Sequence, residues 1–312
     1  MVTLVIPVKN IEANEKKIIE NLKDIKVDEI IIVEGNNPSF QRNEAVKNSN
    51  SDLIYFLDDD SIPDKLNIKR AEEIFKKSQD IAVVGGPAIQ TKFRNFWQRV
   101  FSIIFSSLWA TGKSRARYTK IGQIRETDEK ELILCNMFVK KEIFLKEGGF
   151  RDELYPNEEN EFLNRIKRKG YKIIYDPEIV VEREHRENFR EFIKQCFRYG
   201  KGRAEQIFFE FALSDFINFI PAIFVFYLFS LFFVHNIFYF SFLLIYLLLN
   251  FLFSLAAIKT IKDIGCFFVL FLCFPLLHIL YGTGFIAGVF MKFIGLKKKM
   301  DKNIKIKKLE LK

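Results

Sequence analysis

A long apolar block near the C-terminus constrains this chain more than any other feature. Residues 216–291 contain only three charged side chains, Lys259, Lys262 and Asp263, although 28% of the whole sequence is charged. Half of the 36 phenylalanines lie in the same block. Neither a uniformly mixed globular fold nor a disordered chain is compatible with this division. The sequence therefore predicts a charged part that meets water and a part embedded in lipid.

The apolar block divides into three runs. Residues 216–234 and 237–258 are each long enough to cross a bilayer core of about 30 Å at about 1.5 Å per residue. The third run, 264–291, is interrupted by Pro275 and three glycines, so it fits one kinked span or a re-entrant pair. We expect a transmembrane helical domain of about three segments over residues 214–291.

A lysine-rich tail, residues 292–312, follows this domain. It holds nine Lys against Asp301 and Glu310, which accounts for most of the formal charge of +9. We expect it to contact anionic lipid head groups, and we expect no nucleic-acid binding, since the basic residues do not alternate with aromatics on a folded surface. Three crossings would leave the tail outside, against the positive-inside tendency, whereas an even number would return it to the cytoplasm.

The first half of the chain alternates short β-branched runs with charged helical stretches. This alternation predicts βαβ units and a doubly wound, mostly parallel sheet. Ligands bind such sheets at the carboxyl ends of the strands, where Glu34 and Asp58–Asp60 stand. The expected strands cover residues 2–8, 29–35, 52–60, 81–87, 131–141 and 170–176, with a helix at about 158–169.

Two further stretches have an amphipathic character. Residues 93–110 are apolar and aromatic, and we expect a helix in the membrane interface with Trp97 and Trp109 at head-group depth, or else a core helix. Residues 188–213 predict an amphipathic interfacial segment that leads into the apolar block. The N-terminal residues lack the features of a signal peptide, which predicts that the soluble domain is cytoplasmic in a multi-pass protein of the cell membrane.

Asp58, Asp59 and Asp60 directly follow a hydrophobic strand. Two carboxylates at positions i and i+2 after a strand can share a Mg²⁺ or Mn²⁺ ion and face a nucleotide diphosphate. An acidic turn exposed to solvent is the alternative for these three residues alone.

Six segments occur in series between about residues 2 and 206. They are VTLVIPVKN, EIIIVEGNNPS, LIYFLDDDSIP, CNMFVKKEIFLKEGGFRDE, NEENEFLNRIKRKGYKIIYDPE and FRYGKGRAEQ. In this order they resemble glycosyltransferase family 2, whose members are membrane-associated inverting sugar transferases with the GT-A fold. The last segment resembles the branch of succinoglycan-type and archaeal transferases. The resemblance implies a GT-A domain over residues 1–187.

The resemblance implies a role for residues on the donor side. Glu34 stands where the family usually has the Asp that accepts a hydrogen bond from the nucleotide base. Asp60 and Asp58 would ligate Mn²⁺ or Mg²⁺, with His185 as a further metal ligand or as a surface residue. The nucleotide-sugar site would comprise Pro7, Glu34, Asp58, Asp59, Arg198, Lys201 and Arg203.

The acceptor side and the general base also follow from the resemblance. Glu158 and Glu159 align with the family's catalytic acid pair, with Glu159 as the base and Glu158 as its neighbour, or the reverse. The acceptor side would include Asn136, Gly148 and Gly149. The basic residues Arg198, Lys201 and Arg203 suit a pyrophosphate or a lipid phosphate, or lipid heads alone.

These features together predict a membrane-bound inverting glycosyltransferase. It would move one sugar from a nucleotide-diphosphate sugar, in the first place a UDP-sugar, to a lipid-linked acceptor. Repeated polymerisation is not expected, because the Gln-x-x-Arg-Trp motif of the processive synthases is absent. The alternatives are direct transfer to polyprenyl phosphate, a nucleotidyltransferase, for which PVKNIEANE lacks the glycine of a phosphate loop, and a non-catalytic membrane scaffold.

Overall fold

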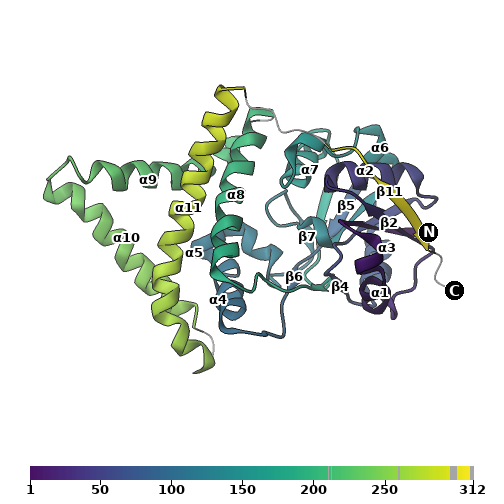
Figure 1. Cartoon of the computed structure of the whole chain (residues 1–312), viewed down its shortest axis with the longest axis horizontal. Helices are drawn as coiled ribbons and strands as arrows, with labels where there is room; N and C mark the ends of the chain where they lie inside the picture. The colour runs from purple at the N-terminus through teal and green to yellow at the C-terminus, as the bar shows by residue number, and fades with distance from the viewer. Residues whose placement is uncertain (210, 212, 259–260, 296–300, 310–312) are drawn as a thin grey trace. The chain divides into compact units, whose positions relative to one another are not determined.

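The chain forms two compact units in the computed structural model, which describes residues 1–209, 211, 213–258, 261–295 and 301–309 (Figure 1). The first unit contains Met1–Thr91, Ala116–Glu184 and Lys298–Lys312, and the second contains Lys92–Arg115 and His185–Lys297. From the sequence we expect residues 92–115 in the first domain and the C-terminal tail outside it. In the structure residues 92–115 belong to the second unit, and the tail from Lys298 belongs to the first.

The first unit is built on an eight-stranded sheet with the order β11-β2-β1-β3-β8-β5-β9-β7. Strands β1, β2 and β3 pair in parallel, as expected for βαβ units, and β5 pairs in parallel with β9. The strands are β1 (Val2–Val8), β2 (Glu29–Glu34), β3 (Leu53–Phe56), β5 (Ile81–Gly85), β7 (Arg125–Glu126), β8 (Met137–Lys140), β9 (Lys172–Tyr175) and β11 (Lys305–Leu309).

The prediction of a mostly parallel sheet is wrong for this unit. Four of the seven pairings between the described strands are antiparallel, namely β11–β2, β3–β8, β8–β5 and β9–β7. The main cause is β8, which enters between β3 and β5 and runs against both. A second sheet is small and joins β4 (Ile62–Pro63), β10 (Val181–Glu182) and β6 (Ala88–Ile89).

Both faces of the large sheet are buried. Side chains alternate between the two faces of a strand, and here each set enters a separate apolar cluster. On β1, Leu4 and Ile6 belong to one cluster and Val5 to the other. On β2, Ile30 and Ile32 separate from Ile31 in the same way. This explains why the early strands read as continuous apolar runs in the sequence.

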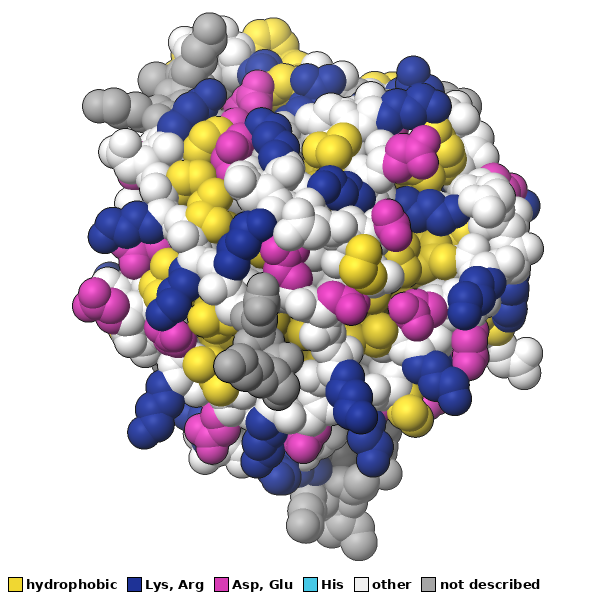
Figure 2. All heavy atoms as spheres, turned by 90° about the vertical axis from the view of Figure 1, so that its right-hand side faces the viewer, with side chains coloured by type: hydrophobic (Ala, Val, Ile, Leu, Met, Phe, Trp, Pro, Cys, Tyr) yellow, Lys and Arg dark blue, Asp and Glu magenta, His cyan; other side chains and the backbone are white. Residues whose placement is uncertain are grey.

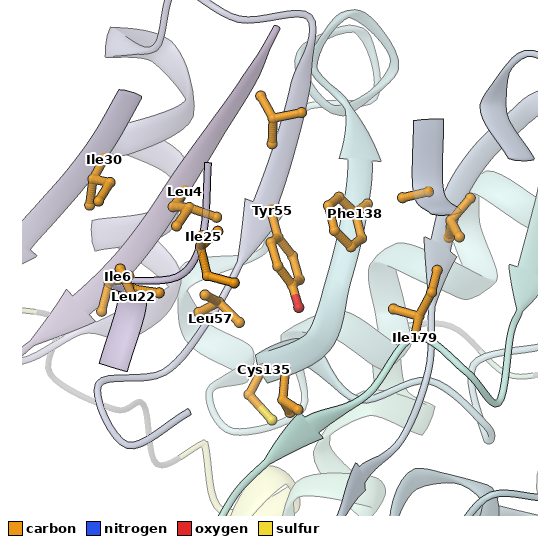
Figure 3. Packing of buried hydrophobic residues seen from close by; sticks show 14 of the residues in the cluster. Leu4, Ile6, Leu22, Ile25, Ile30, Tyr55, Leu57, Cys135, Phe138 and Ile179 are labelled. Atoms are coloured by element: carbon orange, nitrogen blue, oxygen red, sulfur yellow. The ribbon is translucent and has the colours of Figure 1, made fainter. Parts of the chain in front are cut away.

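A polar network crosses one of these clusters. The Tyr55 ring stacks on Phe138 with the ring centroids 3.7 Å apart (Figure 3). The Tyr55 hydroxyl donates a hydrogen bond to Asn136 Oδ1 at 2.7 Å and accepts one from Asn67 Nδ2 at 3.1 Å. Asn136 Nδ2 donates to the carbonyls of Pro87 and Ile179. The network therefore ties β3, β8 and the small sheet together.

Two helices of the first unit, α1 and α2, begin at an asparagine cap. The side chains of Asn10 and Asn37 accept hydrogen bonds from backbone N–H groups three residues later, so each fixes a helix directly after β1 or β2. The helices are α1 (Ile11–Leu22), α2 (Pro38–Asn48), α3 (Asn67–Phe75), α6 (Lys141–Lys146) and α7 (Glu158–Arg168).

The C-terminal tail adds a strand to the first unit. β11 runs antiparallel to β2 with Lys305 opposite Glu34 and Leu309 opposite Ile30, and in Figure 1 it lies beside the first strands of the chain. Figure 2 shows basic and acidic side chains interspersed over the face that includes this edge. Lys307 pairs with Glu15 at 2.6 Å and Lys308 with Glu29 at 3.0 Å.

These contacts revise the expectation that residues 292–312 contact lipid head groups. The lysines of β11 are matched by carboxylates of their own unit, which belong to β2 and to α1. Residues 296–300 and 310–312, which the same expectation includes, lie outside the described residues.

The second unit is helical. Residues 93–110 form two helices rather than one, and the inner face of α4 is buried, with Phe101 stacked on Phe192 of α8 at 4.4 Å. This packing corresponds to the core-helix alternative for α4. The helices are α4 (Phe96–Phe105), α5 (Leu108–Thr111), α8 (Phe189–Phe209), α9 (Ile220–Ser230), α10 (Ile237–Ala256) and α11 (Phe267–Phe293).

Two helices of this unit are long and apolar enough to cross a membrane. They are Ile237–Ala256 and Ile264–Phe293, the second of which continues through Pro275. The first apolar run lies in a shorter apolar helix, Asp215–Ser230, which consists of a 3₁₀ segment followed by the 11 residues of α9. At about 1.5 Å per residue it extends about 24 Å and falls short of a bilayer core of about 30 Å. Three membrane segments are therefore not confirmed.

Glycines bring α8 and α11 into backbone contact. A Cβ at Gly200 would lie 2.0 Å from the Tyr281 carbonyl oxygen, and one at Gly284 would lie 2.1 Å from that of Phe197. No side chain fits at such distances, so the two helices touch because both positions are glycine. The glycines that interrupt the third apolar run thus serve helix packing.

This close approach predicts the effect of a single methyl group. Gly284→Ala should force α8 and α11 apart and lower the free energy of unfolding by about 1–3 kcal/mol, measured by thermal unfolding in detergent. Gly265→Ala is the matched control, because a Cβ at Gly265 meets nothing within 4 Å. Equal stability of the two variants would contradict the packing described above.

Candidate active site

The acids that follow β3 lie against two arginines. Asp58 Oδ1 is 2.7 Å from one terminal nitrogen of Arg42, and Asp58 Oδ2 is 2.9 Å from a nitrogen of Arg183. Asp60 Oδ1 lies 2.9 Å from Arg183 Nε. Asp59 is partly buried, and burial, with the charges of Asp60 and Asp58 adding to it, raises its pKa. The turn is therefore a paired cluster rather than the solvent-exposed acidic turn of the alternative interpretation.

Glu158 and Glu159 begin α7 and reach the same cluster. The second terminal nitrogen of Arg42 donates to Glu158 Oε1 at 3.1 Å, so one guanidinium connects the end of β3 with the start of α7. Glu159 Oε1 lies 3.7 Å from Arg117, whose guanidinium also donates to Asn160. The structure thus brings together residues that are far apart in the sequence: Arg42 and Glu158 are separated by 116 positions.

The two glutamates differ in their surroundings. The side chain of Glu158 is 1% exposed and that of Glu159 is 9% exposed. Burial, with the negative charge of Glu159 as a second cause, raises the pKa of Glu158 to about 7 although Arg42 opposes the shift. Glu158 therefore loses its proton at a higher pH than an ordinary glutamate, and Glu159 is the more accessible carboxylate of the pair.

Glu34 stands at the carboxyl end of β2, next to β1. Its Oε2 accepts a hydrogen bond from the Ile11 N–H at 2.8 Å, and this bond, with Lys305 nearby, lowers the pKa of Glu34. Pro7 lies on β1 opposite Val33 of β2. Because β1, β2 and β3 are parallel, the strand ends that carry Glu34 and Asp58 meet at one edge of the sheet.

The residues expected on the acceptor side shape the backbone near this cluster. Asn136 is fully buried and its amide bonds only to the core network, so it positions β8 rather than reaching into solvent. Gly148 and Gly149 have φ values of 81° and 68°, which favour glycine. A Cβ at Gly149 would lie 2.6 Å from Asn43 Oδ1, and Asn43 holds the backbone of Phe150.

The remaining predicted site residues belong to the second unit. His185 stacks on Phe105 with the ring centroids 5.6 Å apart. On α8, Arg203 is buried and donates to Gln206 at 3.0 Å, while Lys201 lies 3.7 Å from Glu205 and Arg198 is on the same helix. Their roles toward a metal or a phosphate stay predictions.

A divalent cation fits the chemistry of the Asp58–Asp60 turn. Among the residues that the structure describes, no three His, Cys, Asp or Glu side chains are grouped so that they could hold a metal alone. Mg²⁺ and its relatives are commonly held by one or two carboxylates together with substrate phosphates. Asp58 and Asp60 each pair with the guanidinium of Arg183 at 2.9 Å. Two carboxylates of the turn thus face one positively charged group, as they would face a bound cation.

Three arginines of the cluster were not predicted from the sequence. Arg42, Arg117 and Arg183 come from α2, from a 3₁₀ segment (Gly112–Arg117) and from the residue after β10. Their partners are distant in the chain, so spacing carries no signal for Arg42 or Arg117. Arg183 had a weak signal, since it lies two residues from His185.

Comparison with known proteins identifies the family. The protein-family model described as "Glycosyltransferase like family 2" matches residues 5–202, more than half of the chain. This chain belongs to glycosyltransferase family 2. It is therefore a glycosyltransferase, and neither the nucleotidyltransferase nor the scaffold alternative applies.

A curated relative is archaeal. The dolichyl N-acetyl-alpha-D-glucosaminyl phosphate 3-beta-D-2,3-diacetamido-2,3-dideoxy-beta-D-glucuronosyltransferase of Methanococcus voltae is 27% identical over 169 residues. The match covers 53% of this chain and 50% of the relative, so the chain matches about half of that protein's length.

A solved structure shares the fold. The mannosyltransferase PcManGT from Pyrobaculum calidifontis, in complex with GDP-Man and Mn²⁺, superposes with a TM-score of 0.54 at 13% identity. The match covers 93% of this chain and 87% of that one. The first unit is thus a GT-A-like domain with a mixed sheet, as members of glycosyltransferase family 2 have.

The raised pKa of Glu158 predicts a pH dependence of stability. Between its ordinary pKa of 4.5 and about 7 the folded state holds a proton that the unfolded state has lost, so this carboxyl lowers stability as the pH rises through that window. Glu158→Gln does not ionise, so its free energy of unfolding should fall less than that of the original protein across this window. The difference should be about 3 kcal/mol at most.

The measurement is chemical unfolding of both proteins at several pH values from 4.5 to 8. Glu153→Gln, which removes an exposed carboxylate from the segment before α7, is the control and should keep the slope of the original protein. Parallel pH profiles for Glu158→Gln and the original protein would show that Glu158 is ionised throughout.

Proposed function

We propose that this glycosyltransferase moves one sugar, with inversion, from a nucleotide-diphosphate sugar to a lipid-linked acceptor at a membrane. The observation that carries the proposal is the cluster in which Arg42 connects Asp58 with Glu158. It brings together the acidic turn after β3 and the acidic start of α7. In the proposed transfer these two segments would lie on opposite sides of the reacting bond. The Methanococcus voltae relative, named for a dolichyl-linked substrate, supports a lipid-linked acceptor.

The donor would lie at the carboxyl ends of β1, β2 and β3. There Glu34 would face the base, while Pro7 would lie beside it and Asp58 and Asp59 would face the sugar and the diphosphate. Asp60 with Asp58 would hold Mn²⁺ or Mg²⁺, a choice that the Mn²⁺ in the PcManGT complex supports. When bound, the ion would stabilise the charge that develops on the leaving diphosphate. Arg183 would have to release at least one carboxylate to it.

Glu159 is the general base in this proposal. The acceptor oxygen attacks C1 of the sugar, its proton passes to the Glu159 carboxylate, and the nucleotide diphosphate leaves from the opposite face. Glu158 suits this role less well, because its side chain is buried and bound to Arg42 and because its pKa is raised above that of an ordinary glutamate. It would instead hold Arg42 against Asp58.

Membrane association would come from the second unit. Side chains of α9 and α10 expose large apolar surfaces, for example Phe229 at 63% and Phe238 at 78%. In addition, the chain leaves the first unit at Glu184 and joins it again through the strand Lys305–Leu309. Both ends of the second unit therefore connect to the same side of a membrane, and the chain crosses it an even number of times, two or none.

The catalytic assignment predicts a specific loss of turnover. Glu159→Gln keeps the size of the side chain but removes the base, so kcat should fall about 10²–10⁴-fold with little change in donor KM. The assay offers a panel of nucleotide sugars, a membrane-lipid extract and Mn²⁺ or Mg²⁺, and lipid products are read by mass spectrometry.

Glu153→Gln is again the control and should keep full turnover. A Glu159→Gln variant with unchanged kcat would overturn the assignment of the base. A product with several added sugars would contradict single transfer, and a sugar attached directly to the lipid phosphate would favour the polyprenyl-phosphate alternative.

The topology predicts the accessibility of the tail. The four native cysteines are buried, so single cysteines introduced as Glu153→Cys and Lys302→Cys can be labelled selectively. With the catalytic unit in the cytoplasm, a membrane-impermeant thiol reagent should label neither variant in intact cells and both after permeabilisation. Labelling of Lys302→Cys alone in intact cells would require an odd number of crossings.

A further inference from the structure

The C-terminal tail lies against the turn that follows β2. A Cβ at Gly35 would lie 3.1 Å from the Asn303 carbonyl oxygen and 3.1 Å from a methyl group of Ile304. Asn36 Nδ2 donates to Asp301 Oδ2 at 3.0 Å. Three residues of the tail, Asp301, Asn303 and Ile304, thus contact the turn just beyond Glu34, and Ile304 packs on the apolar cluster that contains Val33.

The tail also places a cation beside Glu34. The two residues are paired in register on β11 and β2, and Lys305 Nζ lies 3.5 Å from Glu34 Oε1. The other carboxylate oxygen, Oε2, is held by the Ile11 N–H at 2.8 Å, which fixes the side chain. The Lys305 side chain remains 81% exposed. A fixed acceptor and an accessible donor therefore stand next to each other at the sheet edge.

We propose that residues 301–305 wall the base end of the donor site, and that Glu34 and Lys305 together select a base that presents N–H beside C=O. This rests on the proposed function, in which Glu34 faces the base. Uracil offers N3–H beside O4, and guanine offers N1–H beside O6. Glu34 accepts from the N–H and Lys305 donates to the carbonyl oxygen.

The other two bases present the opposite pattern. Cytosine and adenine each place a ring nitrogen acceptor beside an amino donor, so Glu34 would face a lone pair and Lys305 would face N–H groups. Either mismatch leaves a charged group without a partner at the base. The donor would accordingly be a uridine, thymidine or guanosine diphosphate sugar. The pair cannot separate these three, since thymine has the N3–H and O4 of uracil and guanine presents the same donor–acceptor pattern.

Nucleotide binding to the full-length protein tests the inference. UDP, GDP, CDP and ADP are titrated by calorimetry in detergent with Mg²⁺. We expect UDP or GDP to bind at least about tenfold more tightly than CDP and ADP. Lys305→Ala should weaken the preferred nucleotide about three- to tenfold, a moderate effect because the ammonium is exposed, and should leave CDP and ADP nearly unchanged.

Lys307→Ala is the matched control. It removes a lysine from the same strand and breaks an ion pair with Glu15, away from Glu34. Its affinities should equal those of the original protein. A Lys305→Ala variant that behaves like Lys307→Ala, or an original protein that binds CDP or ADP as tightly as UDP and GDP, overturns the inference while the donor site stands. Failure to bind any of the four nucleotides would instead overturn the proposed function, and the inference with it.

Discussion

The buried guanidinium of Arg42 is the interaction on which the catalytic unit depends. Its side chain is 5% exposed, and it contacts carboxylates from two segments that approach the site from different directions, Asp58 after β3 and Glu158 at the start of α7. A buried ion pair contributes little net stability, but a missing partner leaves an uncompensated charge. The pair therefore acts mainly as a constraint. It requires the acidic turn and α7 to lie in one relative position, and the remaining residues of the site are arranged around it.

The early strands were predictable from the sequence, and the reason is physical. β1 spans the predicted residues 2–8, and β2 the first six residues of its predicted range, because both are buried on two faces and therefore read as unbroken apolar runs. The location of the acids was predictable for a related reason, since parallel strands bring their carboxyl ends to one edge. The mixed character of the sheet was not. β8 is short, and its place between β3 and β5 is decided by tertiary pairing rather than by its own four residues.

The arginines of the site could not be predicted from the sequence. An acid at the end of a strand is recognisable from local context, whereas Arg42 gains its role from two tertiary partners, Asp58 and Glu158, the second of which is 116 residues away. Asn136 illustrates the converse case. The family resemblance places it on the acceptor side, whereas the structure uses its amide inside the core, bonded to Tyr55, Pro87 and Ile179. Resemblance locates a residue, and only packing reveals whether it faces the ligand or supports a neighbour that does.

The tail shows how composition can mislead when pairing is unknown. KIKKL reads as a solvated basic run, yet it covers the open edge of β2, which would otherwise expose unpaired N–H and C=O groups. Three carboxylates match the lysines of this segment: Glu29 and Glu34 of β2 pair with Lys308 and Lys305, and Glu15 of α1 pairs with Lys307. In the proposed membrane arrangement the same pairing bears on the conflict between three apolar runs and a lysine-rich tail. Because β11 and β1 belong to one sheet, both would lie on one side of the membrane, and the charge of the tail would agree with an even number of crossings.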